Sequence, residues 1–592
     1  MPRKFYILSF LLFALTFSAS ADTLGQGERF FISPIYDAGS QVSVTATLRY
    51  VSDRAYFYID NDYWSGISEA ARDHILANTE SLAKEFDSRI HPIETEFFGS
   101  EPNPGIDNDP RTTILLIPLI ENAGGYFDTT NEYSRTAAPN SNQREMIYLN
   151  INELNDQAKM FAFLAHEFQH LISFNQKEKL RGIADDIWLN ELRSEYAPTL
   201  LGYDDIYEGS HLQRRARALI SDPSDSLTEW KNMSADYGQI GLFGEYIGEK
   251  LSPQVISETL KTRSSGINSL GEALAAKGFS DKPLGAYRDW LIANFLNDTS
   301  VNPKFGYSRG GLSDLHTESS RAVTGIQENT AVTISDSIKD WQGRVYDISQ
   351  LQAGNNNTLR INFDSFSLAS FYISYLIFKP DGQYQLYDFS PAPSSKEINI
   401  PGIGTYFNRI VLIPIKKDKL SGFSSNETPV SLTISLERVV STPPTTPILN
   451  PISAQTAHAV VNNFQLEPST YNLETNLPDG SLIRARGDYK VYVINGSWRR
   501  HIVNSRIFSF YPGLGFEKVI EVDPAVLNQY QKSSLVRYAG SQRVYEVDAS
   551  GARQWLNMGG EAFNASGRSW EAIFMINSHE LNYYLLGRPI LK

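Results

Sequence analysis

The stretch Phe161–Ile172 most constrains the fold, because it combines a helical pattern with two histidines one turn apart. Apolar residues recur in it at spacings of three and four, which predicts a helix with one apolar face. A spacing of four places His166 and His170 on the same side of that helix. Two such imidazoles can bind one tetrahedral metal, and Glu167 between them can act on a nearby water. The alternative is a buried helix with incidental histidines, since the short pattern His-Glu-x-x-His (HExxH) recurs by chance.

A catalytic zinc site needs a third protein ligand, which must come from another segment. Residues 185–197 show a second helical pattern, in which Glu191 lies one turn before Glu195. Residues 171–190 separate His170 from Glu191, which is enough for one helix to end and another to return. We therefore expect Glu191 to be the third ligand. The other histidines are isolated in the sequence and are more typical of surface or core positions.

The chain begins like a secretory signal peptide. Arg3 and Lys4 are basic, Phe5–Phe17 is apolar, and Ala19–Ala21 fits a small-residue cleavage site. The apolar run is shorter than the roughly 20 residues of a membrane span. We therefore expect residues 1–21 to be removed, rather than kept as an anchor. No cysteine is present, which excludes disulfides and a lipid on cysteine.

Composition restricts the partners and the location. The 592 residues are 41% hydrophobic and 12% aromatic, which predicts several folded domains. The formal charge of −14 argues against binding to nucleic acid or to anionic membranes. No later segment has the apolar length of a transmembrane helix. We expect a secreted, extracellular bacterial protein, or one that stays periplasmic or associated with the cell surface.

Residues 22–320 alternate between strand and helix patterns. Strands are expected at 42–50, 55–59, 112–119 and 146–151, a turn at 124–127, and a helix that begins after the N-cap Ser68. Further helices are expected at 212–220, 239–250, 253–261, 267–277 and 283–297. This order predicts an α+β domain with a mixed-sheet lobe and a helical lobe. Residues 22–40 are either a propeptide or the first strands.

The remainder of the chain is rich in strand patterns. Residues 325–440 show the short strands of a β-sandwich, and residues 441–454 form a proline-rich linker. Residues 455–592 then repeat themselves with a period of 53–54 residues, in two copies at about 481–530 and 534–584. Arg500 of the first copy corresponds to Arg553 of the second in this alignment. We therefore expect a multidomain protein whose C-terminal part is a two-copy β-rich domain.

The order of motifs resembles a known group of enzymes. His166–His170 followed by Asn190–Glu195 is similar to the gluzincin metallopeptidases, the thermolysin-like clan, although Glu195 stands where that clan has aspartate. Residues of about 40–300 more closely resemble the hyicolysin family of secreted bacterial metallopeptidases, with Leu192 where that family often has glycine. The matching segments are Phe98–Glu101, Gly105–Pro110, Gly124–Phe127, His166–His170, Trp188–Glu191 and Asp236–Gly238.

The resemblance implies a zincin-like domain that hydrolyses peptide bonds with a zinc-activated water. One Zn²⁺ would be held by His166, His170 and Glu191, with Glu167 as the general base. Glu195 would orient a ligand histidine through a hydrogen bond.

Other positions are expected to serve the substrate. The oxyanion of the reaction needs a donor besides zinc, for which Tyr237 is the first choice and His211 the reserve. The alternative for Tyr237 is a core tyrosine. Gly124, Gly125 and Tyr126 are expected to line the cleft, because glycine admits close approach of a substrate backbone.

An acidic pair lies in the loop before the strand expected at 112–119. Asp107 and Asp109 have the side chains for calcium, although a solvated Asx turn is the favoured interpretation.

The main hypothesis is a secreted zinc endopeptidase acting on proteins or peptides, whose C-terminal domains bind cell-surface or cell-wall material. The alternative is a cell-envelope scaffold with an inactive protease-like domain. Because all three ligands and the general base are present, we favour the enzyme.

Overall fold

The computed structural model describes residues 21–591, except 281, 366, 393–395, 419–426, 441–476, 486–489, 504, 512–514, 516–517, 523, 539–540, 542, 549–550 and 588. The predicted signal peptide, apart from Ala21, and the predicted linker 441–454 therefore lie outside the described residues. The chain forms two compact units. Unit 1 contains residues up to 184, 190–214 and 256–263, and unit 2 contains 185–189, 215–255 and the residues from 264 onward.

Within the described residues, unit 1 is built on a six-stranded sheet of order β1-β2-β3-β4-β6-β5. β4 pairs in parallel with both of its neighbours, and the other pairs are antiparallel, so the sheet is mixed. The strands are β1 (Gly27–Phe31), β2 (Ser43–Val51), β3 (Ala55–Asp60), β4 (Thr112–Ile117), β5 (Gly125–Phe127) and β6 (Met146–Asn150).

Two strand predictions needed correction in this sheet. The segment predicted as a turn at 124–127 is instead the edge strand β5, because Tyr126 and its neighbours pair with β6 in an antiparallel register. β4 ends at Ile117, two residues before the predicted end, because Pro118 has no N–H for the ladder. The strand β1 lies within residues 22–40 and pairs with β2, so this segment is part of the sheet.

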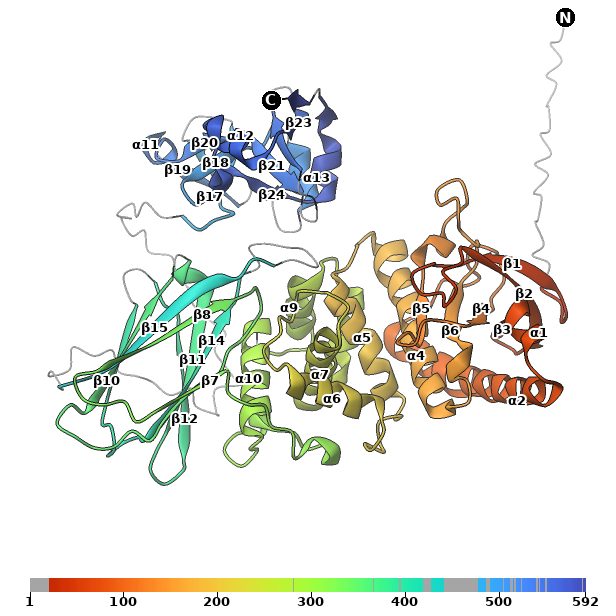
Figure 1. Cartoon of the computed structure of the whole chain (residues 1–592), viewed down its shortest axis with the longest axis horizontal. Helices are drawn as coiled ribbons and strands as arrows, with labels where there is room; N and C mark the ends of the chain where they lie inside the picture. The colour runs from red at the N-terminus through yellow and green to blue at the C-terminus, as the bar shows by residue number, and fades with distance from the viewer. Residues whose placement is uncertain are drawn as a thin grey trace, which may run out of the picture. The chain divides into compact units, whose positions relative to one another are not determined.

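Helices pack against the sheet of unit 1. α2 and α4 lie side by side, and α4 also contacts β5, β6 and α3 (Figure 1). Ser68 caps α2 by accepting a hydrogen bond from the N–H of Ala71, which confirms the predicted start of this helix. The helices are α1 (Asn61–Gly66), α2 (Glu69–Glu85), α3 (His91–Phe98), α4 (Gln157–Ser173), α5 (Ile187–Leu200) and α6 (His211–Ser221); α5 and α6 cross from one unit to the other.

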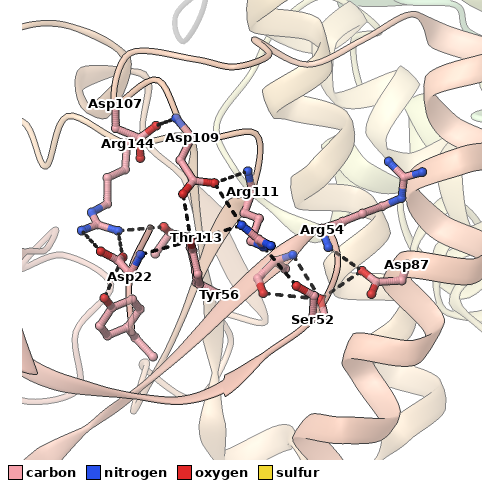
Figure 2. A network of polar contacts seen from close by, with 12 residues as sticks. Asp22, Ser52, Arg54, Tyr56, Asp87, Asp107, Asp109, Arg111, Thr113 and Arg144 are labelled. Atoms are coloured by element: carbon pink, nitrogen blue, oxygen red, sulfur yellow. Dashed lines mark hydrogen bonds and ion pairs between the residues drawn. The ribbon is translucent and has the colours of Figure 1, made fainter. Parts of the chain in front are cut away.

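The N-terminal segment is fastened to the sheet by a polar network (Figure 2). The carboxylate of Asp22 forms an ion pair with Arg144 and accepts a hydrogen bond of 2.8 Å from the hydroxyl of Tyr58. The backbone N–H of Asp22 donates to the hydroxyl of Tyr56 over 3.2 Å, and that hydroxyl donates to Asp109 over 2.8 Å. The segment is thus held by charge and hydrogen bonds as well as by β1.

Unit 2 begins with helices close to those expected. They are α7 (Ser234–Lys250), α8 (Pro253–Glu258), whose last residues belong to unit 1, α9 (Gly266–Ala276) and α10 (Pro283–Leu296). The predicted single domain 22–320 is therefore divided between the two units. One reason is that α10 is tied to the strands that follow: Arg288 Nη1 lies 2.6 Å from Asp388 Oδ2. In the part of the chain that the structure describes, no helix has the length and apolar character needed to cross a membrane.

Two sheets with a common core follow these helices in unit 2. Their orders are β13-β10-β15-β8 and β12-β11-β14-β9-β7, and inward residues of both sheets, such as Ile361 and Leu412, belong to one buried cluster. β7 lies ahead of the predicted boundary at 325 and pairs with β9. The strands are β7 (Arg321–Thr324), β8 (Ala331–Ile338), β9 (Tyr346–Ser349), β10 (Thr358–Asp364), β11 (Phe371–Phe378), β12 (Tyr384–Phe389), β13 (Glu397–Pro401), β14 (Arg409–Lys416) and β15 (Val430–Val439).

The C-terminal part of unit 2 contains two sheets with the same arrangement. In each, an antiparallel run (β16-β17-β18 or β21-β22-β23) is flanked by strands parallel to its ends. The strands are β16 (Leu482–Ala485), β17 (Val491–Asn495), β18 (Trp498–His501), β19 (Val519–Val522), β20 (Gln531–Ser533), β21 (Leu535–Tyr538), β22 (Val544–Val547), β23 (Ala552–Asn557), β24 (Phe574–Ile576), β25 (Leu585–Leu586) and β26 (Ile590–Leu591), with short helices α11 (Pro524–Leu527), α12 (Gly560–Ala565) and α13 (Ser578–Tyr583).

One residue correspondence in this part was wrong. Arg499 donates to the carbonyl of Leu527, and Arg553 donates to the carbonyl of Leu581, in each case 28 residues further along. Arg553 therefore corresponds to Arg499, not to Arg500 as expected. Arg500 lies on the other side of the same strand, where it forms an ion pair of 2.7 Å with Glu580.

Candidate metal centre

Helix α4 positions the residues of the HExxH pattern. Asp156 caps the helix, because its side chain accepts a hydrogen bond of 3.1 Å from the N–H of Lys159. Leu164, Phe168 and Leu171 are fully buried against the rest of unit 1, which fixes the rotation of the helix. His166 and His170 consequently present their rings on one side, one turn apart.

The ligand atoms of three residues converge at this place. Nε2 of His166 lies 3.2 Å from Nε2 of His170. The two carboxylate oxygens of Glu191, on α5, lie 3.4 Å from His166 Nε2 and 3.6 Å from His170 Nε2. Ligands held about 2.0–2.1 Å from a tetrahedral zinc are about 3.3–3.4 Å from one another, so the three separations fit one zinc ion. Among the described residues, this is the group of three whose ligand atoms all lie within 4.8 Å of one another.

Ser194 holds the ring of His170 in the orientation that a ligand needs. Its hydroxyl donates to Oε1 of Gln169 over 2.6 Å, which leaves the oxygen free to accept from Nδ1 of His170 at 3.1 Å. With the proton on Nδ1, the lone pair of Nε2 points toward Glu191 and the other histidine. The hydrogen bond to Ser194 therefore selects the tautomer that can bind a metal.

Glu195 makes the corresponding contact to His166. Oε1 of Glu195 lies 3.3 Å from Nδ1 of His166, and Oε2 lies 2.6 Å from Nε2 of His211. Glu195 and His211 are both buried. His211, the reserve choice for an oxyanion donor, is thus placed behind Glu195, where it holds the carboxylate that orients His166.

The charges of this cluster determine its protonation. Burial disfavours the imidazolium of His166, but the carboxylates of Glu191 and Glu195 raise its pKa to about 10. Burial also disfavours the charged form of Glu191, but the two histidines lower its pKa to about 2. Glu191 is therefore ionised at neutral pH. A metal cation that binds here competes with protons for the histidine nitrogens.

Glu167, the expected general base, is buried beside the two histidines of α4. It follows His166 on α4 and is only 7% exposed. Burial raises the pKa of its carboxyl, which makes it a stronger proton acceptor than an exposed glutamate. A Cβ added to Gly125 would lie 2.9 Å from Cγ of Glu167, so the edge strand β5 runs directly beside this side chain.

The chain is similar to a bacterial neutral metalloprotease. Neutral metalloprotease ShpI of Staphylococcus hyicus is 26% identical over 223 residues, which cover 32% of this chain and 48% of the relative. The chain thus spans about half the length of the curated relative that it matches. No protein-family model matches the chain.

Solved structures give only weak likenesses. The M60 catalytic domain with two CBM51 domains of Clostridium perfringens ZmpB is 9% identical with a TM-score of 0.20, over 66% of this chain and 59% of that one. A mutant of PliG from Escherichia coli, a periplasmic inhibitor of g-type lysozyme, is 12% identical with a TM-score of 0.13, over 20% of this chain and 98% of that one. Scores this low carry no argument about this protein.

The glycine segment expected to line a cleft is placed beside the site, but not with every side chain facing it. A Cβ on Gly124 would lie 2.5 Å from the ring of Phe163 on α4, so a larger residue there would require that ring to move. The side chain of Tyr126 is buried in the core, stacked on Tyr148 with ring centroids 4.1 Å apart. Tyr126 can therefore meet a substrate through its backbone, but not through its hydroxyl, which accepts from the N–H of Ser33.

Two tyrosines are relevant to the expected oxyanion donor. Tyr237 belongs to unit 2, on the first turn of α7, where its half-buried side chain donates a hydrogen bond of 2.8 Å to Asn232. Tyr36 belongs to unit 1 and was missed, because no motif surrounds it in the sequence. Its ring stacks on Tyr126 at 4.8 Å, and burial together with the charges of Glu167 and Glu191 raises its pKa.

The acidic loop forms the expected Asx turn, but the turn is not solvated throughout, because Asp109 is buried. Oδ1 of Asp107 accepts from the N–H of Asp109 over 2.9 Å, and Oδ1 of Asp109 accepts from the N–H of Arg111 over 3.0 Å. Asp109 is further bound by Tyr56. Asp109 is therefore fully engaged within the protein, whereas Asp107 also approaches a second group of carboxylates.

Proposed function

We propose that the protein is a secreted zinc-dependent endopeptidase of the gluzincin type. The observation that carries the proposal is the convergence of His166, His170 and Glu191 at separations of 3.2–3.6 Å, with Glu167 beside them. The similarity to a neutral metalloprotease over 223 residues supports the same reading. The residues fit zinc, because two imidazoles and one carboxylate are the donor set of many catalytic zinc sites.

The chemistry divides between the metal and the side chains. When bound, zinc supplies a Lewis acid that lowers the pKa of a coordinated water toward about 7. Glu167 accepts a proton from the attacking water and returns it to the leaving amine of the cleaved peptide. Its burial keeps competing water away and favours this transfer.

The remaining contacts of the cluster hold its geometry. Glu195 orients His166 and is itself held by His211, while Ser194 orients His170. Because the imidazole rings are already held in place, less conformational entropy is lost when the metal binds, and one coordination geometry is favoured. These are positioning residues, since each acts through a histidine.

The substrate is proposed to add to the free edge of β5. Among the described residues, β5 has a neighbouring strand on one side only, and Gly125 brings its backbone next to Glu167. An extended peptide can pair with such an edge through main-chain hydrogen bonds, independently of its sequence. Tyr237 is proposed to donate to the oxyanion, and Tyr36 to contact the substrate near Glu167.

The remaining domains are proposed to locate the enzyme. Residues 1–21 are proposed to direct export, residues 325–440 to form an accessory sandwich, and residues 455–592 to hold two copies of one unit. The matching strand arrangement and the matching contacts of Arg499 and Arg553 support the duplication. We propose that this part binds cell-surface or cell-wall material.

The test is hydrolysis by the purified full chain. Casein and a mixed peptide pool should be cleaved, cleavage should stop with a zinc chelator, and it should return when zinc is restored. A scaffold with an inactive protease-like domain would instead bind envelope material through residues 455–592 and cleave nothing. Absence of zinc together with absence of cleavage would refute the proposal.

A further inference from the structure

A buried loop of unit 2 connects α6 to α7. Residues 222–233, all of them in the part of the chain that the structure describes, form no helix or strand. Within this loop, residues 226–230 are all buried. Loops normally run over the surface, because each buried backbone N–H and C=O needs a partner. The 222–233 loop must therefore be held by a neighbouring element.

That element is one end of the sandwich, the two packed sheets of β7–β15 in the same unit. β8 and β15 are antiparallel neighbours, so the residues after β8 and those before β15 emerge at the same end (Figure 1). The N–H of Leu227 donates to the carbonyl of Trp341 over 2.9 Å. The hydroxyl of Ser226 donates to the carbonyl of Asp340 over 2.6 Å. The sandwich thus supplies acceptors for the buried loop.

Glu427, shortly before β15, adds a buried carboxylate to this contact. It is 4% exposed. Its Oε1 accepts a hydrogen bond of 2.8 Å from the hydroxyl of Thr228, and its Oε2 lies 3.0 Å from the hydroxyl oxygen of Ser226. The N–H of Glu427 donates to Oε1 of Glu229 over 3.1 Å, and Glu229 also forms an ion pair with Lys339. Hydrogen bonds that a carboxylate accepts are among the strongest in proteins, so Glu427 is the main polar anchor of the loop.

The end of the sandwich that holds the loop is itself fixed. Asp340 and Lys416 form an ion pair in which both side chains are fully buried. The N–H of Trp341 donates to the carbonyl of Lys416 over 2.8 Å, and its ring packs on that of Tyr287 of α10, with centroids 5.8 Å apart. Trp341 has a φ of +49°, which a bulky residue adopts only where its surroundings hold it. The loop therefore rests on a rigid support.

The other end of the loop contacts Tyr237. The ring of Trp230 packs edge-on against the ring of Tyr237, with centroids 4.9 Å apart. The hydroxyl of Tyr237 donates to Oδ1 of Asn232 over 2.8 Å. The carboxylate of Asp236 accepts a hydrogen bond of 2.7 Å from the N–H of Met233, which ties the loop to the first turn of α7. The loop thus joins the sandwich to the surroundings of Tyr237.

We propose that the sandwich positions Tyr237 through the 222–233 loop, with Glu427 as a positioning residue. The inference rests on the proposed function, in which Tyr237 donates to the oxyanion. A donor stabilises an oxyanion only when its position is already fixed before the reaction. The sandwich is then a part of the peptidase, and not only a means of attachment.

A contact on the other side of Tyr237 gives the competing explanation. Arg215 of α6 lies over its ring, with Cζ 4.5 Å from the centroid. If Arg215 and the packing of α7 are sufficient to hold Tyr237, loss of the Glu427 contacts loosens the loop without affecting the tyrosine. The two explanations therefore differ in whether the effects of Glu427 and Tyr237 on catalysis are coupled.

The first measurement is hydrogen exchange in the purified full chain. Glu427→Gln keeps the size of the side chain, but its amide nitrogen cannot accept a hydrogen bond from the loop. We expect exchange in residues 222–237 to become about 10-fold faster or more, and Thr228→Val to act in the same direction. Asp347→Asn is the matched control, because it weakens an ion pair with Arg409, two contacts of 2.9 Å, elsewhere in the sandwich. It should leave this exchange unchanged.

The second measurement is steady-state kinetics on one peptide substrate. Glu427→Gln should lower kcat by about 10²-fold with KM and zinc content unchanged, as expected for a displaced group that acts in the transition state. In the Tyr237→Phe background the same substitution should cost little more, because the hydroxyl that it positions is already absent. Asp347→Asn should keep the wild-type kcat.

Two results would overturn the proposal. One is exchange in residues 222–237 that is the same in wild type and Glu427→Gln. The other is a kcat loss in Glu427→Gln that is equally large with and without the Tyr237 hydroxyl, which would show that Glu427 does not act through Tyr237. If the wild type cleaves no peptide, the proposed function fails, and the exchange measurement still decides whether the sandwich holds the loop.

Discussion

Nδ1 of His166 lies 3.3 Å from Oε1 of Glu195, which is itself buried against His211. We propose that this contact orients the ring, whose Nε2 lies 3.4 Å from Glu191. Replacing Glu195 with glutamine weakens this hydrogen bond without changing the shape of the side chain. We expect zinc affinity or activity to fall about 10–100-fold in Glu195→Gln.

Zinc competition with a chromophoric chelator measures this effect. The Glu195→Asp variant is the matched comparison, because it keeps the charge and shortens the side chain by one methylene. A zinc affinity that is the same in wild type and Glu195→Gln would show that the contact does not orient the ligand.

The serine behind the other ligand gives a second prediction. Ser194 is fully buried, and its oxygen is the acceptor for Nδ1 of His170. In Ser194→Ala this acceptor is lost, so the ring can adopt the wrong tautomer or turn away. We expect a fall in zinc affinity of about 10-fold or more with retained folding, measured by the same competition and by circular dichroism. Unchanged affinity would indicate that packing alone holds His170.

The two tyrosines predict different kinetic effects. Removal of one oxyanion donor typically costs about 10²–10³-fold in kcat. We expect that loss in Tyr237→Phe, with zinc content unchanged. Tyr36→Phe should mainly raise KM, because Tyr36 is proposed to contact the substrate. Steady-state kinetics on one peptide, with zinc measured in each sample, separate the two roles; a large kcat loss in Tyr36→Phe alone would exchange the assignments.

Two buried glutamates, Glu132 (6% exposed) and Glu145 (2% exposed), predict that the stability of the fold depends on pH. Burial, followed by the charge of Glu145, raises the pKa of Glu132, and burial raises that of Glu145, both from an ordinary value of 4.5. The folded state therefore binds more protons than the unfolded state above that value, so stability falls as pH rises. Asp107 strengthens this effect and Lys179 opposes it.

Thermal unfolding should therefore show a lower Tm at pH 8 than at pH 6. Glu132→Gln should show a smaller pH dependence than wild type. A wild-type Tm that rises steadily from pH 6 to pH 8 would contradict the raised pKa values.

The parts of the site that sequence reasoning could predict were those coded by local spacing. Two histidines four residues apart on an amphipathic pattern share a helix face in almost any fold. Glu191 follows them after enough residues for one helix to end and a second to come back to the histidines. The contact of Ser194 with His170 and Gln169 was not predictable in this way, because it depends on how α4 and α5 pack. The place of Tyr36 depends on the register of the N-terminal segment against the sheet.

The errors have equally local causes. Tyr126 was expected in a cleft, but in a strand alternate side chains face opposite sides, and this one faces the core. Arg500 was aligned with Arg553 because adjacent arginines make the sequences match equally well in two registers. A shift of one residue on a strand reverses the face, and the matching carbonyl contacts of Arg499 and Arg553 distinguish the two alignments.

The most direct test of the account is the Glu167→Gln variant. Glu167 is not one of the three residues whose ligand atoms converge, so the variant should bind one zinc per chain as the wild type does. Because the amide cannot accept the proton, cleavage of a peptide library should fall by about 10²–10⁴-fold. Equal cleavage by both proteins, with zinc bound in both, would contradict the account.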